Sequence, residues 1–341
     1  MLTQKRFSSL MVAGFLLLAP FSAIAQDAIG AGASFPNTVY QKWIEMAKAE
    51  ANLSIVYSSA GEAAGGQNQI LAREVDFAVS GLPMPAEMRR NANLVQFPVL
   101  IGAVVPIVNL PDVASGQVKL DGAVLGRIFT GAIKTWNDPA IVALNPGVAL
   151  PAIEIRPVSI RDGGLGASFG FTQYILAADA SWRERHGTIV TKRWAVGSTV
   201  GSAGDMIETV KTLPGALGYL PYGLASRARM TLVALRNPAG HFVTPSIDGI
   251  REAAANADWD GAKELVMTLV NQPGAASWPI AQTSYAQMAR DPKEPARNQA
   301  ARRFFDFAFN NGTTIMADFG FVPLPEAVRA RVREVWAGLG S

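Results

Sequence analysis

The chain has 341 residues, with 30 lysines and arginines against 27 aspartates and glutamates, two histidines and no cysteine. This length is more than one hydrophobic core usually serves, so we expect two domains. The missing cysteines exclude thiol nucleophiles, disulfides and cysteine metal sites, and the balanced charge is not that of a nucleic-acid-binding protein. His186 and His241 are too few and too far apart in the sequence to indicate a metal site, so we expect no metal.

The first 25 residues have the pattern of a secretory signal peptide. Lys5 and Arg6 precede an apolar run at 10–18, and an A-x-A sequence ends at Ala25. The run is shorter than the roughly 20 residues of a membrane anchor, which disfavours the alternative of a retained anchor. We expect cleavage after Ala25 and release into the periplasm, since no cysteine is available for a lipid anchor. Without Lys5 and Arg6 the charged residues number 28 against 27, which is close to neutral.

A glycine-rich run, Gly30-Ala-Gly-Ala-Ser-Phe-Pro36, follows the leader and precedes a segment with helical spacing of apolar residues at 39–47. The first backbone N–H groups of a helix have no partner within it, and the helix dipole favours negative charge there. Glycines let the backbone approach a ligand closely. The pattern indicates an anion-binding turn; the alternative is an ordinary turn with Ser34 as a helix N-cap.

Short apolar strands alternate with helical segments along the rest of the chain, which predicts an α/β fold with mainly parallel sheets. The apolar and β-branched run at 97–109 is typical of a strand that is covered on both faces. We expect strands at 53–57, 75–80, 97–109 and 153–159 and from 278 onward, and helices at 67–72, 125–130, 205–213, 259–268, 300–310 and 327–336.

A second glycine-rich turn, at 161–168, follows the expected strand at 153–159 and opens another helix. The two glycine-rich helix starts lie more than a hundred residues apart, and each follows a strand. If two lobes place them across one cleft, both can direct N–H groups at the same small anion. The alternative is that the two turns are unrelated.

The motifs of this chain resemble those of the periplasmic phosphate-binding proteins of Pst-type ABC importers, over nearly the whole exported sequence. The matching stretches are Gly30–Pro36 with Tyr40 and Trp43, then 75–77, 96–98, 108–109, 120–122, 136–138, 144–147, 213–219, 271–272, 278–280 and 304–306. Their order and spacing agree with the family throughout.

The resemblance implies a type II periplasmic-binding-protein fold, in which two hinge crossovers join two lobes, each a mainly parallel sheet flanked by helices. Lobe I is expected at 26–103 and 279–341, and lobe II at 104–278, after the signal peptide at 1–25. The implied function is the capture of phosphate or a related oxyanion and its delivery to an inner-membrane permease. A monomer without a cofactor, without enzymatic activity and without nucleic-acid partners is expected.

Several of the family's phosphate ligands have counterparts here. The arginine of the family falls on Arg161, whose guanidinium can pair with an oxyanion through two hydrogen bonds. The hydroxyl and N–H of the first turn fall on Ser34 and Phe35. The full set that the resemblance assigns to the ligand is Ser34, Phe35, Ala64, Arg161, Gly166 and Ala167.

Other positions depart from the family pattern. The serine-rich turn of the family reads Glu62-Ala-Ala-Gly-Gly here, and its aspartate falls on Gly81. The hydroxyls of the second turn fall on Leu165 and Ala167, while Ser168 keeps a hydroxyl one position later. Glu62 is a candidate to replace the missing carboxylate. The alternative is that Glu62 is an exposed loop residue with no role in binding. Asp162 either orients Arg161 or caps a local turn.

These departures leave a second function open, that of a paralogue which keeps the fold but binds another ligand or has a signalling or surface role. An exported phosphoesterase is a third possibility. It lacks support, because no nucleophile–base arrangement and no carboxylate cluster with metal-ligand spacing is present in the sequence.

Overall fold

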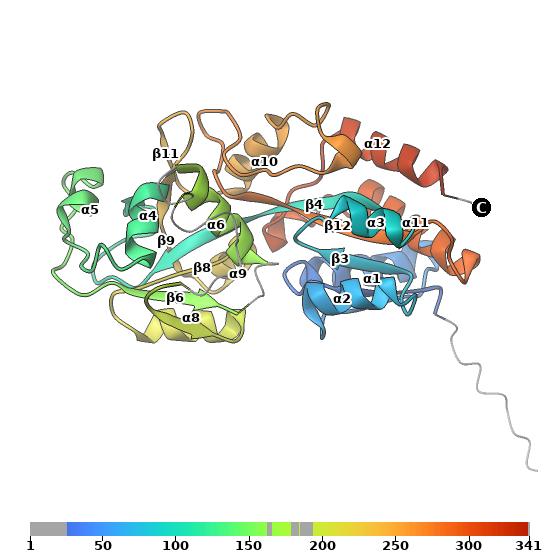
Figure 1. The fold of residues 1–341 in the computed structure, drawn as a ribbon, viewed down its shortest axis with the longest axis horizontal. Coiled ribbons are helices and arrows are strands. Elements are labelled where there is room, and N and C mark those ends of the chain that lie inside the picture. The colour runs from blue at the N-terminus through green and yellow to red at the C-terminus, as the bar shows by residue number, and fades with distance from the viewer. Residues whose placement is uncertain (1–25, 162–165, 179–183, 185–193, 340–341) are drawn as a thin grey trace, which may run out of the picture.

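The computed structural model describes residues 26–161, 166–178, 184 and 194–339. Strands from both ends of the chain form the first lobe, which we call the β1–β3 lobe (Figure 1). Its elements are β1 (Ala28–Gly32), α1 (Asn37–Ala51), β2 (Ile55–Ser58), α2 (Glu62–Leu71), β3 (Phe77–Ser80), α3 (Ala86–Asn91), the first part of β4 (Leu94–Val108), β12 (Ala281–Ala289), α11 (Pro295–Asn311), η2 (Ala317–Phe319) and α12 (Glu326–Ala337).

The middle of the chain forms the second lobe, which we call the β6–β8 lobe. Its elements are the end of β4, β5 (Lys119–Leu120), α4 (Gly122–Phe129), α5 (Pro139–Leu144), β6 (Arg156–Ile160), α6 (Ala167–Ala178), β7 (Ser198–Val200), α8 (Ala203–Thr212), β8 (Ala216–Pro221), α9 (Tyr222–Arg227), β9 (Thr231–Leu232), β10 (Ala234–Arg236), β11 (Phe242–Val243) and α10 (Ile247–Ala255). A short helix, η1 (Lys263–Leu265), follows α10 and leads the chain back toward the first lobe.

One strand belongs to both lobes. The order of the large sheet is β2-β1-β3-β12-β4-β8-β6-β7, so β4 lies at its centre. Residues 94–103 of β4 pair with β12, and residues 104–108 pair with β8. Figure 1 shows β4 running from one lobe into the other. All fifteen residues of β4 are buried, as the apolar run that begins at Phe97 predicts for most of the strand.

The expected parallel order is confirmed within each lobe. Strand β1 is parallel to β2 and β3, and β6 is parallel to β7 and β8. It does not extend to the centre, where β12 and β4 run antiparallel to their neighbours. The sheet is therefore mixed rather than mainly parallel, because the chain enters and leaves the second lobe through two adjacent strands of opposite direction.

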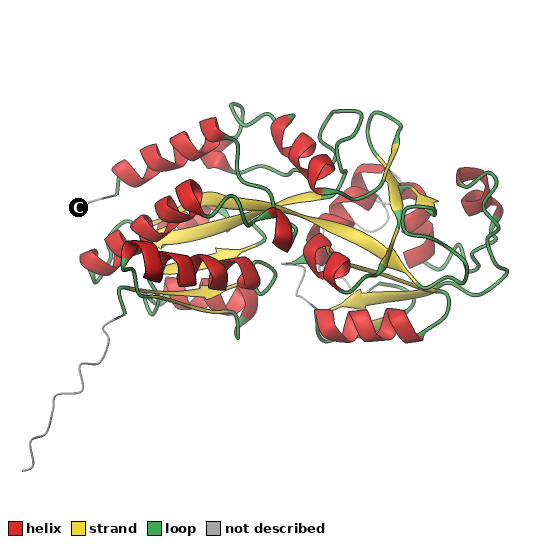
Figure 2. Ribbon diagram, turned by 180° about the vertical axis from the view of Figure 1, so that it is seen from behind, coloured by secondary structure: helices red, strands yellow, loops and turns green. Residues whose placement is uncertain are grey.

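Helices cover both faces of the sheet, as the view from behind in Figure 2 also shows. In β3, Phe77 packs against the rings of Phe304 and Phe305 on α11, and these two rings in turn contact Tyr40 on α1. The next residue, Ala78, packs with Ile70 of α2 in a separate cluster. This alternation follows from the strand period of two, which sends neighbouring side chains to opposite faces.

The expected helix at 259–268 is wrong. The structure has turns and the three-residue η1 there, and Glu264 and Leu265 have positive φ values of 53° and 57°. Two consecutive left-handed residues cannot continue an α-helix. The segment instead follows the first lobe, where the main chain of Met267 exchanges hydrogen bonds with the hydroxyl of Tyr285 on β12.

Candidate functional site

The first glycine-rich turn, at 32–36, is pressed against the end of β3. Gly32 has a φ of 144°, and a Cβ atom on it would lie 2.1 Å from the main-chain oxygen of Val79. The N–H of Ala33 donates a hydrogen bond to that same oxygen at 2.9 Å. Only glycine fits both the conformation and the space, so this part of the sequence fixes where the turn lies.

Ser34 and Phe35 follow at the end of the turn. Ser34 is exposed, whereas Phe35 is half-buried with its ring centroid 5.9 Å from that of Phe321. The N-cap position of α1 is occupied by Pro36, and no side chain caps the helix. The interpretation of Ser34 as a plain N-cap is therefore wrong. The ring of Phe35 anchors the turn, and Ser34 stays at the surface.

A second helix start lies beside this turn. Helix α2 begins at Glu62, and a Cβ on Gly66 would lie 2.5 Å from the Cα of Gly32. The close approach of the two backbones brings the start of α2 against the first turn. Ala64 is exposed in the first turn of α2, where N–H groups have no acceptor within the helix. Glu62 thus opens the helix, so its predicted place in a loop is corrected to the first helical position.

The β6–β8 lobe contributes Arg161 and the start of α6. Arg161 directly follows β6, is exposed, and donates its main-chain N–H to Val200 at 2.9 Å. Helix α6 begins at Ala167, so the N–H groups of Ala167 and Ser168 have no acceptor within the helix. Leu165 and Asp162, which the sequence singles out, fall outside the described residues.

The hydroxyl of Ser168 is directed into the second lobe. Its Oγ lies 2.8 Å from the hydroxyl of Tyr219 on β8 and 3.4 Å from the main-chain oxygen of Ile160. Ser168 is only 6% exposed. This hydroxyl therefore ties the start of α6 to β6 and β8.

One side chain links the two lobes next to these turns. The amide nitrogen of Gln282, on β12, donates to the main-chain oxygen of Gly81 at 3.0 Å and to that of Gly166 at 3.3 Å. Gly81 follows β3 in the first lobe, and Gly166 precedes α6 in the second. The loops that the resemblance assigns to the ligand thus come within reach of one amide. Gln282 was not predicted from the sequence, because β12 (AQTSYAQMA) contains several polar residues and none of them stands out by its spacing.

Arg161 is the candidate source of positive charge for these turns. Within residues 26–161, 166–178, 184 and 194–339, no ion pair involves Arg161. No group of three or more metal-ligating side chains occurs in this described part of the chain, and none of its helices is long and apolar enough to cross a membrane. A guanidinium and helix-start N–H groups are suited to holding a small anion.

Known proteins share the fold of this chain. The family model described as "PBP superfamily domain" matches residues 22–311. A phosphate-binding protein from Stenotrophomonas maltophilia superposes with a TM-score of 0.63 at 17% identity, over 90% of this chain and 93% of that one. A phosphate ABC transporter substrate-binding protein from Clostridium perfringens has a TM-score of 0.61 at 15% identity, over 87% and 99%. The architecture is that of a two-lobed solute-binding protein.

Sequence relatives are closer. The chain is 38% identical to the phosphate-binding protein PstS of Pasteurella multocida over 312 residues, which are 92% of this chain and 90% of that protein. It is 36% identical to PstS of Haemophilus influenzae over 317 residues, 93% of this chain and 94% of the relative. This chain belongs to the PstS family of phosphate-binding proteins.

Proposed function

We propose that this protein is the exported solute-binding component of a phosphate ABC importer. It holds phosphate or a related oxyanion between its lobes in the periplasm, after removal of residues 1–25, and delivers it to an inner-membrane permease. The relatives that are named phosphate-binding proteins support this function. The observation that carries it is the shared amide of Gln282, which brings the turns at Gly81 and Gly166 of the two lobes together.

The ligand is held mainly by main-chain groups. Arg161 supplies the positive charge, Ser34 supplies a hydroxyl, and the N–H groups of Phe35, Ala64, Gly166 and Ala167 complete the donor set. Backbone donors at helix starts are already oriented toward an anion, which limits the ordering that binding requires. An anion buried by closure needs such a dense set of donors, because desolvation otherwise outweighs the attraction.

The hinge lies where β4 changes partner. We place lobe I at 26–103 and 279–341 and lobe II at 104–278. The pairing of Ala103 with β12 and of Val104 with β8 supports the first boundary. A hydrogen bond from Val104 N–H to the oxygen of Ile280, at 3.0 Å, supports the second. Bending of these two strands would close the lobes over the ligand.

The site has fewer side-chain hydrogen-bonding groups than the family pattern. The hydroxyls of the family fall on Ala64, Leu165 and Ala167, and Gly81 provides no carboxylate. The Ser168 hydroxyl faces Tyr219 instead. Each hydrogen bond to a charged group contributes roughly 1.5–3 kcal/mol. Losing about four approaches the roughly 8 kcal/mol that corresponds to micromolar binding. These absences favour a second candidate, a paralogue with a different ligand or a signalling role.

The missing carboxylate also bears on selectivity. A protonated phosphate needs an acceptor for its O–H, whereas sulfate does not. With Gly81 in place of the acidic residue, discrimination between the two anions should weaken. Glu62 stays a candidate acceptor.

Calorimetric titration of the purified protein with phosphate, phosphite, sulfate and arsenate tests both candidates. Binding of phosphate in the micromolar range supports the importer component. No heat and no thermal shift with phosphate up to millimolar concentration would exclude phosphate as the ligand. Identification of a co-purified compound other than phosphate would then favour the paralogue.

Two accompanying expectations have simple tests. A solute-binding protein that docks on a permease is expected to be monomeric, which light scattering checks. Such a protein has no catalytic function, so sustained turnover of a chromogenic phosphate ester would contradict the proposal.

A further inference from the structure

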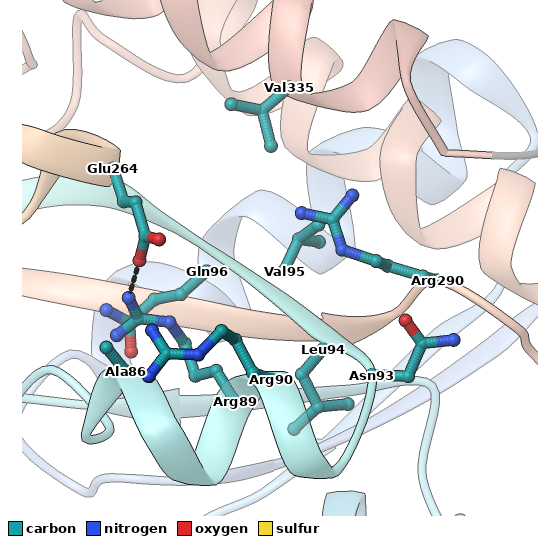
Figure 3. Close-up of a pocket in the computed structure, with 10 residues that line it drawn as sticks. All are labelled: Ala86, Arg89, Arg90, Asn93, Leu94, Val95, Gln96, Glu264, Arg290 and Val335. Carbon is teal, nitrogen blue, oxygen red and sulfur yellow. Dashed lines mark hydrogen bonds and ion pairs between the residues drawn. The ribbon is translucent and has the colours of Figure 1, made fainter.

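A cavity of about 290 Å³ with several charged lining residues lies in the β1–β3 lobe, apart from the turns described above. Figure 3 shows it between α3, the beginning of β4, the end of β12 and α12. The residues that define its chemistry are Arg89, Arg90, Gln96, Glu264, Arg290 and Val335. None of them belongs to the proposed ligand site.

The lining of this cavity has an excess of positive charge. Buried Arg89 forms an ion pair with Glu264, which neutralises both groups. Arg90 and Arg290 are exposed, and neither has an ion-pair partner in the described part of the chain. Three arginines and one glutamate leave two net positive charges. In Figure 3, the guanidinium of Arg90 lies beside that of Arg89, while Arg290 points from beyond β12 toward the side of the cavity that Val335 lines.

A buried amide in the lining lacks an acceptor. Gln96 is 5% exposed, and its Oε1 accepts hydrogen bonds from the N–H of Met84 at 2.7 Å and from Nε2 of Gln287 at 2.9 Å. Because the N–H of Met84 can only donate, the oxygen of Gln96 must face it. This leaves Nε2 of Gln96 as a donor without a partner among the described residues. Buried donors are nearly always satisfied, so this nitrogen is available to an oxygen of a ligand or of a bound water.

We propose that this cavity binds a small organic oxyanion, a carboxylate or phosphate ester with a short apolar body. The two unpaired guanidiniums match the anionic groups, and Nε2 of Gln96 matches one of their oxygens. Val335 and Ala86 line the same space and suit a carbon skeleton. A cavity of about 290 Å³ has room beyond that needed for an inorganic ion and is at the lower end of small-molecule sites.

Nuclear magnetic resonance of the arginine Nε–Hε groups tests this site directly. The purified protein is titrated with succinate, glycerol 3-phosphate or inorganic phosphate at constant ionic strength, with chloride as the reference anion. We expect succinate or glycerol 3-phosphate to shift the signals of Arg90 and Arg290. The two probes distinguish a carboxylate ligand from a phosphate ester. Equal shifts with chloride would mean an adventitious ion only, and no shift with any probe would equally overturn the proposal.

Variants separate this cavity from the site between the lobes. The double variant Arg90→Ala/Arg290→Ala should weaken binding of the organic anion about tenfold or more, because two charge-assisted contacts are lost. It should leave calorimetric binding at the interlobe site unchanged. The matched control Arg127→Ala/Arg303→Ala removes two exposed helix arginines elsewhere and should change neither.

A charge test is independent of the arginines. Gln96→Glu keeps an oxygen for Met84 and nearly the same volume but places a carboxylate in the cavity wall. It should abolish anion binding while the variant retains its cooperative thermal transition. Unchanged affinity in either Gln96→Glu or the double variant would remove this cavity as an anion site.

Discussion

The side-chain amide of Gln282 donates a hydrogen bond to the main-chain oxygen of Gly166, 116 residues away in the chain. The same nitrogen donates to the oxygen of Gly81, in the other lobe. Both N–H groups of one amide are thus used to hold the two lobes together at the edge of the turns that form the proposed site. The relative position of Gly81 and Gly166 therefore depends on the uncharged side chain of Gln282.

Gln282→Met should weaken phosphate binding and lower the free energy of unfolding by about 1–3 kcal/mol. The variant has a similar shape but leaves two carbonyl oxygens at 3.0 and 3.3 Å without their donor. Urea denaturation and calorimetry measure the two effects. Gln299→Met, on the exposed face of α11, is the control and should leave both unchanged. Wild-type affinity in Gln282→Met would show that the link does not position the site.

Arg161→Ala should abolish detectable binding of any oxyanion. It removes the positive charge of the proposed site, and charge-assisted hydrogen bonds are roughly twice as strong as neutral ones. Calorimetry with phosphate gives the result, and circular dichroism checks the fold. Arg156 is an exposed arginine at the start of the preceding strand β6, and Arg156→Ala should bind as the wild type does. Retained affinity in Arg161→Ala would exclude Arg161 as a ligand.

Restoring the missing oxygens should strengthen binding. Ala64→Ser and Ala167→Ser each place a hydroxyl at a helix start of the proposed site, and each should tighten phosphate binding by about tenfold, or about 1.4 kcal/mol. Titration of the single and double variants measures the gain. Ser202→Ala, at the cap of α8, serves as a control for stability without a change in affinity. Unaltered binding in both serine variants would place the ligand elsewhere.

Gly81→Asp should change selectivity rather than overall affinity. Its carboxylate can accept the proton of monohydrogen phosphate but repels sulfate, which has no proton to donate. Competition between phosphate and sulfate in a titration gives the ratio of the two dissociation constants. Gly81→Asn, with an uncharged side chain of similar size, separates charge from bulk. An equal ratio in the aspartate and asparagine variants would contradict the prediction.

Tyr40→Phe should stabilise the protein by about 1 kcal/mol at neutral pH. The hydroxyl of Tyr40 is buried without a hydrogen-bond partner among the described residues, and burial raises the pKa of this side chain. A raised pKa favours the neutral form in the folded state, so stability is full below the unfolded pKa of about 10 and falls above it. The variant should therefore lose less stability than the wild type above about pH 10. Thermal melts across this range measure the difference, with the half-buried Tyr222→Phe as control.

The sequence was sufficient for the parts of the fold that local pattern governs. The run at 97–109 predicted β4, and the glycines at 30–32 predicted the turn that the structure places against Val79. In both cases the cause is local, an apolar strand covered on both faces or a backbone position where only glycine fits. The family motifs added the two-lobed arrangement, which single strands and turns do not define.

The pairing of strands that lie far apart in the chain could not be predicted from local sequence patterns. The bridge made by Gln282 depends on the register of β12 against β4, which includes an irregularity between Ser284 and Tyr285. The apolar spacing at 259–268 matched a helix, but the segment follows the surface of the sheet with Glu264 and Leu265 left-handed. Tertiary contacts override periodicity in such a case, since the chain there is positioned by Tyr285 and Arg331.

The continuity of β4 from one lobe into the other has a mechanical consequence. Because one continuous β-strand is common to both lobes, the lobes can rotate relative to each other only if this hydrogen-bonded strand twists or bends. The motion is therefore an elastic deformation of a strand and not the free rotation that a flexible loop would allow. Unfolding of either lobe also removes a strand that pairs with the centre of the sheet in the other lobe. Thermal or denaturant unfolding should therefore show one transition with a single midpoint for both lobes.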